Sequence, residues 1–209
     1  MYKFNSAFKS LLKEADSNNG IIDGSVSLDH LYLRELPEFF KDLTIDGDFS
    51  CSHNKITSLK NCPKIINGSF SFTGNNISSL DGMPTDIGGF CILSDNNLTS
   101  LDGLSQTLHR LHGISFRKNK LTNLNGLNMD VVYSVFNISE NRLTSLKGCP
   151  NIVYGYVYVN DNLLTSLDGI SKTIDGNLSC YGNPVVFSIE YINEITYVDG
   201  DIYNTDAAF

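Results

Sequence analysis

The sequence is poor in basic residues: 15 Lys and Arg stand against 23 Asp and Glu, which gives a net charge of -8. The basic residues are scattered and form no stripe, so the chain lacks the feature that binds nucleic-acid phosphates. The same acidic balance disfavours docking on an anionic membrane surface. No apolar run approaches the roughly 18 residues that a membrane-spanning helix needs. We therefore predict that the chain neither binds nucleic acid nor associates with a membrane.

Cysteine is present without any recognisable pattern. The five cysteines are Cys51, Cys62, Cys91, Cys149 and Cys180. Their odd number and the absence of a Cys-x-x-Cys pair argue against a disulfide framework or a structural zinc site, and favour reduced, buried thiols. Residues 1–19 have neither an uninterrupted apolar core nor a small-residue cleavage site, unlike a secretory signal. We predict an intracellular protein of a bacterium or of a phage-infected host, with a place in the virion as an alternative.

A repeat of 21 to 23 residues runs through most of the chain, and asparagine marks it. The column comprises Asn54, Asn75, Asn96, Asn119, Asn141, Asn162 and Asn183. Apolar residues recur five and three positions before each asparagine and two positions after it, and leucine recurs five positions after it until Ser188. A first coil holds Leu31 at the asparagine position, and residues 199–202 begin a truncated last coil. The pattern indicates about nine coils.

Each column has a physical interpretation. Apolar residues two apart lie on one face of a short strand, and one coil cannot bury them alone, so neighbouring coils must stack. The asparagine amide can bind backbone groups where the chain leaves the strand, which predicts a structural asparagine ladder. Glycine recurs seven positions before the asparagine, and we expect a positive φ there. The Asp-Gly pairs at 81–82, 102–103 and 168–169 predict turns on the outer arc.

The run Asn97-Leu98-Thr99-Ser100-Leu101-Asp102-Gly103-Leu104, repeated with small changes, resembles a leucine-rich repeat. It is similar to the short repeats of secreted bacterial effectors. It is closer still to phage-encoded relatives, whose repeat unit contains Asn-x-Leu-Thr-Ser-Leu-x-Gly-x-Pro. The resemblance implies a repeat solenoid with short parallel strands on a concave face and mostly irregular or turn structure on the convex side. The effectors carry a separate ligase domain beyond their repeats, so we do not transfer that activity to this chain.

Three parts of the chain follow from this pattern: an N-terminal capping helix at 1–22, the solenoid at 23–185, and a C-terminal cap with a last partial repeat at 186–209. Caps are expected because a solenoid exposes its core at both ends. Within the first part, Glu14 and Ala15 end a Leu-Lys-Glu-Ala sequence. It resembles the site at which prohead proteases of large phages trim capsid proteins, which is an alternative to a plain capping helix.

The concave face is the predicted site of partner binding. Residues six, four and two positions before each asparagine face this side, over a sheet on the order of 40 Å long. The first three coils present Ser and Asp there, whereas the later coils present Tyr and Asn, a composition found at binding surfaces. The predicted partner-binding residues are Tyr156, Tyr158, Tyr181, Tyr203, Asn137, Asn160, Arg117 and Val135. At residues 90–93 the strand register stays open, because a shift by one residue would exchange the two faces.

The sequence contains no convincing catalytic constellation. His30 and His53 occupy equivalent positions in adjacent coils, so their side chains can stack, but no third histidine or clear fourth ligand completes a metal site. We predict a non-enzymatic protein without metal or cofactor. The leading hypothesis is a module that binds a protein partner in a bacterial or phage setting. The alternatives are a head-associated virion protein processed near Glu14 and a host-directed inhibitor or effector of a bacterial protein; the pattern sets no oligomeric state.

Overall fold

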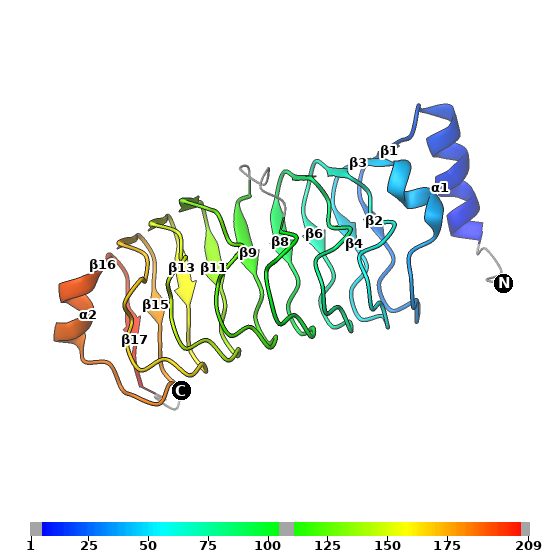
Figure 1. Ribbon diagram of the computed structural model, residues 1–209. Helices are drawn as coiled ribbons and strands as arrows, with labels where there is room; N and C mark the ends of the chain where they lie inside the picture. The colour runs from blue at the N-terminus through cyan, green and yellow to red at the C-terminus, as the bar shows by residue number, and fades with distance from the viewer. Residues whose placement is uncertain (1–5, 105–110, 206–209) are drawn as a thin grey trace.

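The computed structural model describes residues 6–104 and 111–205, which form an elongated solenoid with the two ends of the chain at opposite extremities (Figure 1). One short strand from each coil joins a parallel nine-stranded sheet. The strands are β2 (Val26–Ser27), β4 (Phe49–Ser50), β6 (Phe70–Ser71), β8 (Phe90–Ile92), β9 (Gly113–Ser115), β11 (Val135–Asn137), β13 (Tyr156–Tyr158), β15 (Leu178–Ser179) and β17 (Ile202–Tyr203). The solenoid of short parallel strands predicted from the repeat is confirmed.

A second short strand precedes the first in most coils, and the sequence analysis did not predict it. These strands form two parallel sheets along the upper edge of Figure 1. One sheet contains β1 (Ile21–Asp23), β3 (Thr44–Asp46), β5 (Ile65–Ile66) and β7 (Asp86–Ile87), and the other contains β10 (Val131–Val132), β12 (Ile152–Val153), β14 (Thr173–Ile174) and β16 (Tyr197–Val198). A coil of 23 residues separates them, and its residues 105–110 lie outside the described chain. The outer side is thus more regular than expected.

The core is one continuous column of apolar side chains. The residues predicted to point inward are buried in nearly every coil, and the second strands add an inward isoleucine or valine, such as Ile45, to most layers. Val185 is the exception, since it is 43% exposed while Phe187 is buried in its place. The chain leaves the repeat path here because Ser188 caps a new helix, and its hydroxyl accepts a hydrogen bond from the Tyr191 amide. A capping serine explains why the leucine column stops at this coil.

Every asparagine of the column makes the same four hydrogen bonds, and together these bonds connect the coils. In the central coil, Asn96 Oδ1 accepts from the Ile77 amide at 3.0 Å. Asn96 Nδ2 donates to the carbonyls of Phe72, Leu93 and Ser94 at 2.9, 3.2 and 3.1 Å. Two of these partners belong to the preceding coil. The asparagine therefore satisfies buried backbone groups of two coils at once.

The positive-φ turn of each coil lies directly before the asparagine, a column that the sequence analysis did not identify. His30, His53, Asp95, Lys118 and Glu140 all have φ between 53° and 58°. Asp161 and two glycines continue the same column. This backbone turn ends the strand and directs the asparagine side chain inward. The turn is therefore set by position in the coil, because side chains of very different chemistry adopt it.

The glycine column seven positions before the asparagine has a different cause from the one expected. Only Gly24 has a positive φ; Gly47 and Gly176, for example, do not. A Cβ built at Gly47 would lie 2.5 Å from the Gly24 carbonyl carbon, and one at Gly176 would lie 2.7 Å from that of Gly155. Glycine is required because neighbouring backbones touch at this corner. The Asp-Gly turns agree with expectation, since Gly82, Gly103 and Gly169 have φ near 88°.

Helices lie at both ends of the solenoid (Figure 1). Helix α1 (Ser6–Ser17) packs against β1, with Ala15 buried and Leu11 half-buried. A short 3-10 helix, η1 (Glu38–Asp42), buries Phe40 in the first layer. Helix α2 (Ile189–Ile195) follows the last full coil and buries Ile192. The two helices cover apolar surface that would otherwise be exposed where the stack of coils stops.

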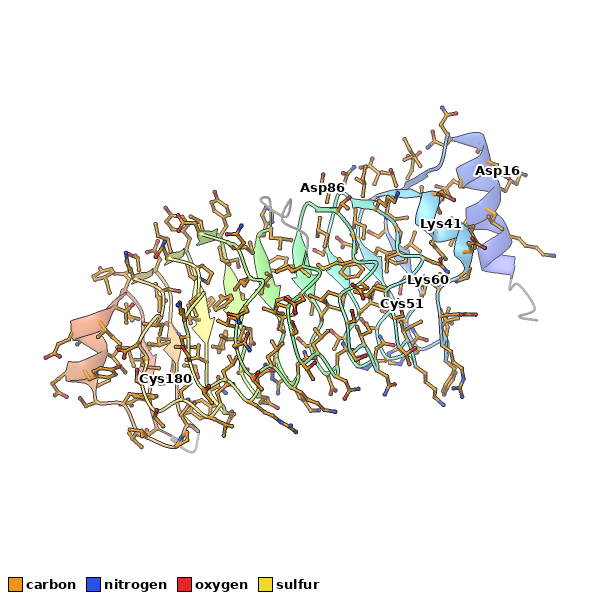
Figure 2. The ribbon with its side chains drawn as sticks, viewed as in Figure 1. Asp16, Lys41, Cys51, Lys60, Asp86 and Cys180 are labelled. Atoms are coloured by element: carbon orange, nitrogen blue, oxygen red, sulfur yellow. The ribbon has the colours of Figure 1, made fainter. Side chains whose placement is uncertain are left out.

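All five cysteines are free thiols, spread along the core from Cys51 near the α1 end to Cys180 near the α2 end (Figure 2). Burial raises the pKa of Cys51, Cys91, Cys149 and Cys180 from 9.0 to about 12. Burial also raises the pKa of Cys62. A neutral buried thiol is a poor nucleophile and a poor metal ligand. The cysteines therefore belong to the packing of the core.

The raised thiol pKa values predict a loss of stability in alkali. Unfolded thiols ionise near pH 9, whereas the folded ones keep their protons to about pH 12. The stabilisation is complete below pH 9 and disappears as pH rises towards 12. We expect the urea midpoint, followed by circular dichroism in reductant, to fall steadily from pH 8.5 to 10.5. The Cys149→Ala variant should show a shallower fall, and a midpoint that does not change over this range would contradict the prediction.

Candidate binding surface

The side chains of the nine-stranded sheet alternate between core and solvent, as predicted. In β13, Val157 is buried, whereas Tyr156 is 45% exposed and Tyr158 is half-buried. Parallel pairing places Val135 beside Tyr156, and Asn137 beside Tyr158. Side chains from neighbouring coils therefore form rows on the solvent-facing side, which is the side predicted to bind a partner.

A pocket of about 410 Å³ lies on this side of the sheet, in its C-terminal half. Side chains from or directly after five neighbouring strands line it. The lining residues are Arg117, Asn137, Ser139, Glu140, Tyr158, Asn160, Ser179, Tyr181 and Tyr203. Six of the eight predicted partner-binding residues are among them. We call this site the tyrosine pocket.

The other two predicted residues, Val135 and Tyr156, lie next to the tyrosine pocket and outside its lining. The rings of Tyr156 and Tyr158 stack with centroids 6.4 Å apart and planes 30° apart. Val135 is half-buried against its neighbours. The exposed Tyr156 ring therefore extends the aromatic surface beyond the rim of the pocket.

Hydrogen bonds within the tyrosine pocket hold its polar side chains in place. Asn137 Oδ1 accepts from the Ser139 amide at 3.1 Å and from its hydroxyl at 2.7 Å. The Ser179 hydroxyl donates to Asn160 Oδ1 at 3.2 Å, and Asn160 Nδ2 donates to Asp161 at 2.6 Å. Asn160 is only 6% exposed. Asn160 therefore positions its neighbours and has little accessible surface for contact with a partner.

Charged side chains at the edge of the pocket are partly paired. The Arg117 guanidinium forms an ion pair with Glu140, and its Nε donates to the same carboxylate at 2.7 Å. In the pocket wall formed by β17, the Tyr203 hydroxyl donates to Asp201 at 3.4 Å. Desolvation, followed by the charge of Asp201, raises the pKa of Tyr203. At neutral pH this phenol is therefore protonated and acts as a donor.

Three lining residues were missed by the sequence analysis: Ser139, Glu140 and Ser179. The two serines stand in the same outward positions of the repeat as the predicted residues, although both are buried by their neighbours. Glu140 lies in the positive-φ turn directly before Asn141. A complete reading of the outward positions would have found the serines. Glu140 could be assigned to the pocket only from the three-dimensional course of the turn that carries it.

The register at residues 90–93 follows the repeat without a shift. Cys91 and Leu93 are buried, and Phe90 and Ile92 are half-buried on the solvent side, where Ile92 pairs with Ser115. A Cβ at Gly113 would lie 2.8 Å from the Phe90 ring, so the ring covers the glycine. The solvent-facing side therefore carries an apolar region in the middle of the sheet.

The N-terminal coils present a different, hydrogen-bonded polar surface. Asp29 Oδ1 accepts from the Ser50 hydroxyl and from the Ser52 amide, both at 2.6 Å. The rings of His30 and His53 stack 4.7 Å apart and 12° from parallel, as predicted. Within the described residues, no group of three His, Cys, Asp or Glu side chains is placed to hold a metal ion. The polar surface is thus organised by its own contacts.

The candidate processing site lies inside helix α1. Ala15 is 5% exposed and belongs to the core, and Glu14 Oε1 accepts a hydrogen bond from the Asp23 amide at 3.0 Å. Cleavage of a folded segment depends on its local opening. Proteolysis between these two residues would therefore require the C-terminal half of α1 to unwind.

Comparison with known proteins identifies the fold. No family model matches the sequence, and no curated protein matches it. Among solved structures, the chain is similar to the leucine-rich repeat domain of APL1B, with a TM-score of 0.51 and 15% sequence identity. The match covers 98% of this chain and 70% of that domain. The chain thus has the fold of a leucine-rich-repeat solenoid. In the described part of the chain, no helix has the length and apolar character to cross a membrane.

Proposed function

We propose that this chain is a non-enzymatic protein-interaction module that binds a partner at the tyrosine pocket, in a bacterial or phage setting. The observation that supports this function is the convergence of Tyr158, Tyr181 and Tyr203 with polar side chains from five neighbouring strands. Tyrosine offers a large, rigid contact area and a polar group at little entropic cost, and aromatic residues are enriched at the energetic centres of interfaces.

The scaffold suits this role because it holds the contact residues before a partner arrives. The strands that present them are fixed by the parallel ladder and by buried asparagines such as Asn141 and Asn162. Preorganisation of this kind lowers the entropy that is lost on binding. The carboxylate of Glu140 is already held by Arg117, which leaves it poorly suited to act as a general base.

The binding surface, which comprises the pocket and the adjoining Tyr156, can be tested by converting Tyr156, Tyr158 and Tyr181 together to serine. At interface centres, loss of one tyrosine typically weakens binding by about 2 kcal/mol, so we expect the triple variant to bind a partner at least roughly 100-fold more weakly. The measurement is affinity capture from bacterial lysate, followed by titration calorimetry with the captured protein. The fold should persist, because all three side chains are wholly or partly exposed to solvent.

A matched variant separates pocket binding from a general loss of tyrosine. Tyr32, Tyr133 and Tyr197 are exposed and do not line the tyrosine pocket, and their conversion to serine should leave capture unchanged. Circular dichroism must show both triple variants folded. If the pocket variant retains every partner that the unmodified protein retains, the proposed binding surface is wrong.

A further inference from the structure

The two segments of the chain that meet at the tyrosine pocket differ in net charge. Residues 151–205, which include the last strands of the sheet, contain seven Asp and Glu and one Lys. Residues 111–150, on the other side of the pocket, contain five Lys and Arg and two Asp and Glu. Most of the net charge of -8 therefore lies in the coils that carry the tyrosines.

The pairing of charges at the pocket increases this asymmetry. Arg117, which lines the pocket, pairs with Glu140, and the neighbouring Lys118 pairs with Asp95 at 3.1 Å. Asp161 follows the lining residue Asn160 in the next coil, and Asp201 directly precedes the last strand, β17, where it accepts a hydrogen bond from Tyr203. Both aspartates are exposed.

No lysine or arginine of the described chain forms an ion pair with Asp161 or Asp201. Each carboxylate accepts a hydrogen bond from a residue that lines the pocket, Asp161 from Asn160 and Asp201 from Tyr203, and Tyr158 and Tyr181 line the same pocket. Aromatic rings attract cations through their negative faces, and the attraction strengthens where a carboxylate is close by. The site thus combines a ring surface with excess negative charge.

We propose that the tyrosine pocket receives a cationic side chain, preferably arginine, from a basic segment of a protein partner. The proposal rests on the proposed function and specifies the chemistry of the partner. Arginine fits better than lysine because its planar guanidinium stacks on a ring while it donates to carboxylates at its edge.

The first experiment compares acetylated and amidated pentapeptides of sequence Gly-X-Gly-X-Gly, with Arg, Lys, Gln or Glu at X, by NMR titration of the full chain. We expect the Arg peptide to bind, the Lys peptide to bind more weakly, and the Gln and Glu peptides to give no saturable shifts. Raising the NaCl concentration from 50 to 500 mM should lower the affinity for the Arg peptide severalfold, because salt screens exposed charges. Preferred binding of the Glu peptide, at Arg117, would overturn the proposal.

The second experiment neutralises the two carboxylates. The double variant Asp161→Asn, Asp201→Asn should bind the Arg peptide roughly fivefold more weakly, since exposed ion pairs contribute modestly to affinity. Asparagine tolerates the positive φ of position 161, so the turn is retained. The control is Asp175→Asn, which removes an exposed carboxylate directly after β14, whereas Asp161 and Asp201 are hydrogen-bonded to the lining residues Asn160 and Tyr203. Equal weakening by control and double variant would contradict a specific site.

The two proposals fail in different ways. If the serine variant of Tyr156, Tyr158 and Tyr181 loses a partner while the Arg peptide does not bind, the interaction module stands and the cationic ligand is wrong. If the Arg peptide binds at the aspartates while capture is unaffected by the tyrosine changes, the proposed partner surface fails.

Discussion

Replacing Asn96 with alanine is expected to lower the free energy of unfolding by about 3 kcal/mol, because buried backbone groups lose their partners. The Ile77 amide would lose its acceptor, and the carbonyls of Phe72 and Leu93 would lose a donor. Water cannot replace the amide without entering the core. Urea unfolding followed by far-UV circular dichroism measures the change, since the chain has no tryptophan for fluorescence.

Two further variants show whether the amide group itself is responsible. Asn97→Ala makes the same chemical change at the next residue, which is half-buried, and should cost well under 1 kcal/mol, as at other surface positions. Asn96→Asp should destabilise at least as much as alanine at pH 7, because it places a charged carboxylate against three carbonyl oxygens. Similar stabilities for Asn96→Ala and Asn97→Ala would show that the asparagine ladder contributes little to the stability of the fold.

The Gly47→Ala substitution should be about as damaging, with a loss of about 3 kcal/mol from overpacking between rigid backbones. The added methyl group would lie 2.5 Å from the Gly24 carbonyl carbon and 2.7 Å from its oxygen. Backbone cannot turn aside as a flexible side chain can, so the first two coils would have to separate. For a chain of this size, we expect the melting temperature to fall by about 6–12 °C.

Gly24→Ala is the matched comparison in the preceding coil. A Cβ at Gly24 meets nothing within 4 Å, but its φ of 87° is unfavourable for alanine. The expected loss is about 1 kcal/mol from backbone strain alone. Thermal unfolding of both variants therefore separates steric contact from conformational preference. A larger loss at Gly24 than at Gly47 would show that close approach of the coils is not what selects glycine.

Much of the solenoid could be predicted because its order is local and repeated. The inward columns, such as Phe70 and Phe72 before Asn75, give each strand its buried face, and any error in one coil is corrected by its neighbours. This is why the register at Phe90 follows the rest. The second strands were missed because only one buried residue, such as Ile66, marks each of them, whereas two apolar columns mark each strand of the nine-stranded sheet.

The glycine and turn columns show where a sequence pattern has more than one physical cause. Glycine at position 47 is compatible with a positive φ or with close packing, and only the distance to Gly24 distinguishes them. The positive-φ column has no common residue type, since His53, Lys118 and Asp161 share it. Composition therefore could not reveal it. The turn is imposed by the need to close the coil.

The binding surface was only partly accessible from sequence. The outward positions of the repeat located Tyr158, Tyr181 and Tyr203 on one side of the sheet, which required nothing beyond strand alternation. That Glu140 joins them and pairs with Arg117 depends on a turn whose direction is set by the stacking of coils. The exposure of Asn160 also depends on its neighbours, because Ser179 of the next coil covers it.

The sequence by itself determined the architecture: repeated apolar positions fix which side chains point inward, and the asparagines of the column link seven of the coils to the coil before. The tertiary structure decided which outward residues form a pocket, which charges are paired, and why glycine occupies the corner. These features depend on distances between residues about 21 positions apart in the chain. Such distances exist only when the coils have stacked, so no local pattern can encode them alone.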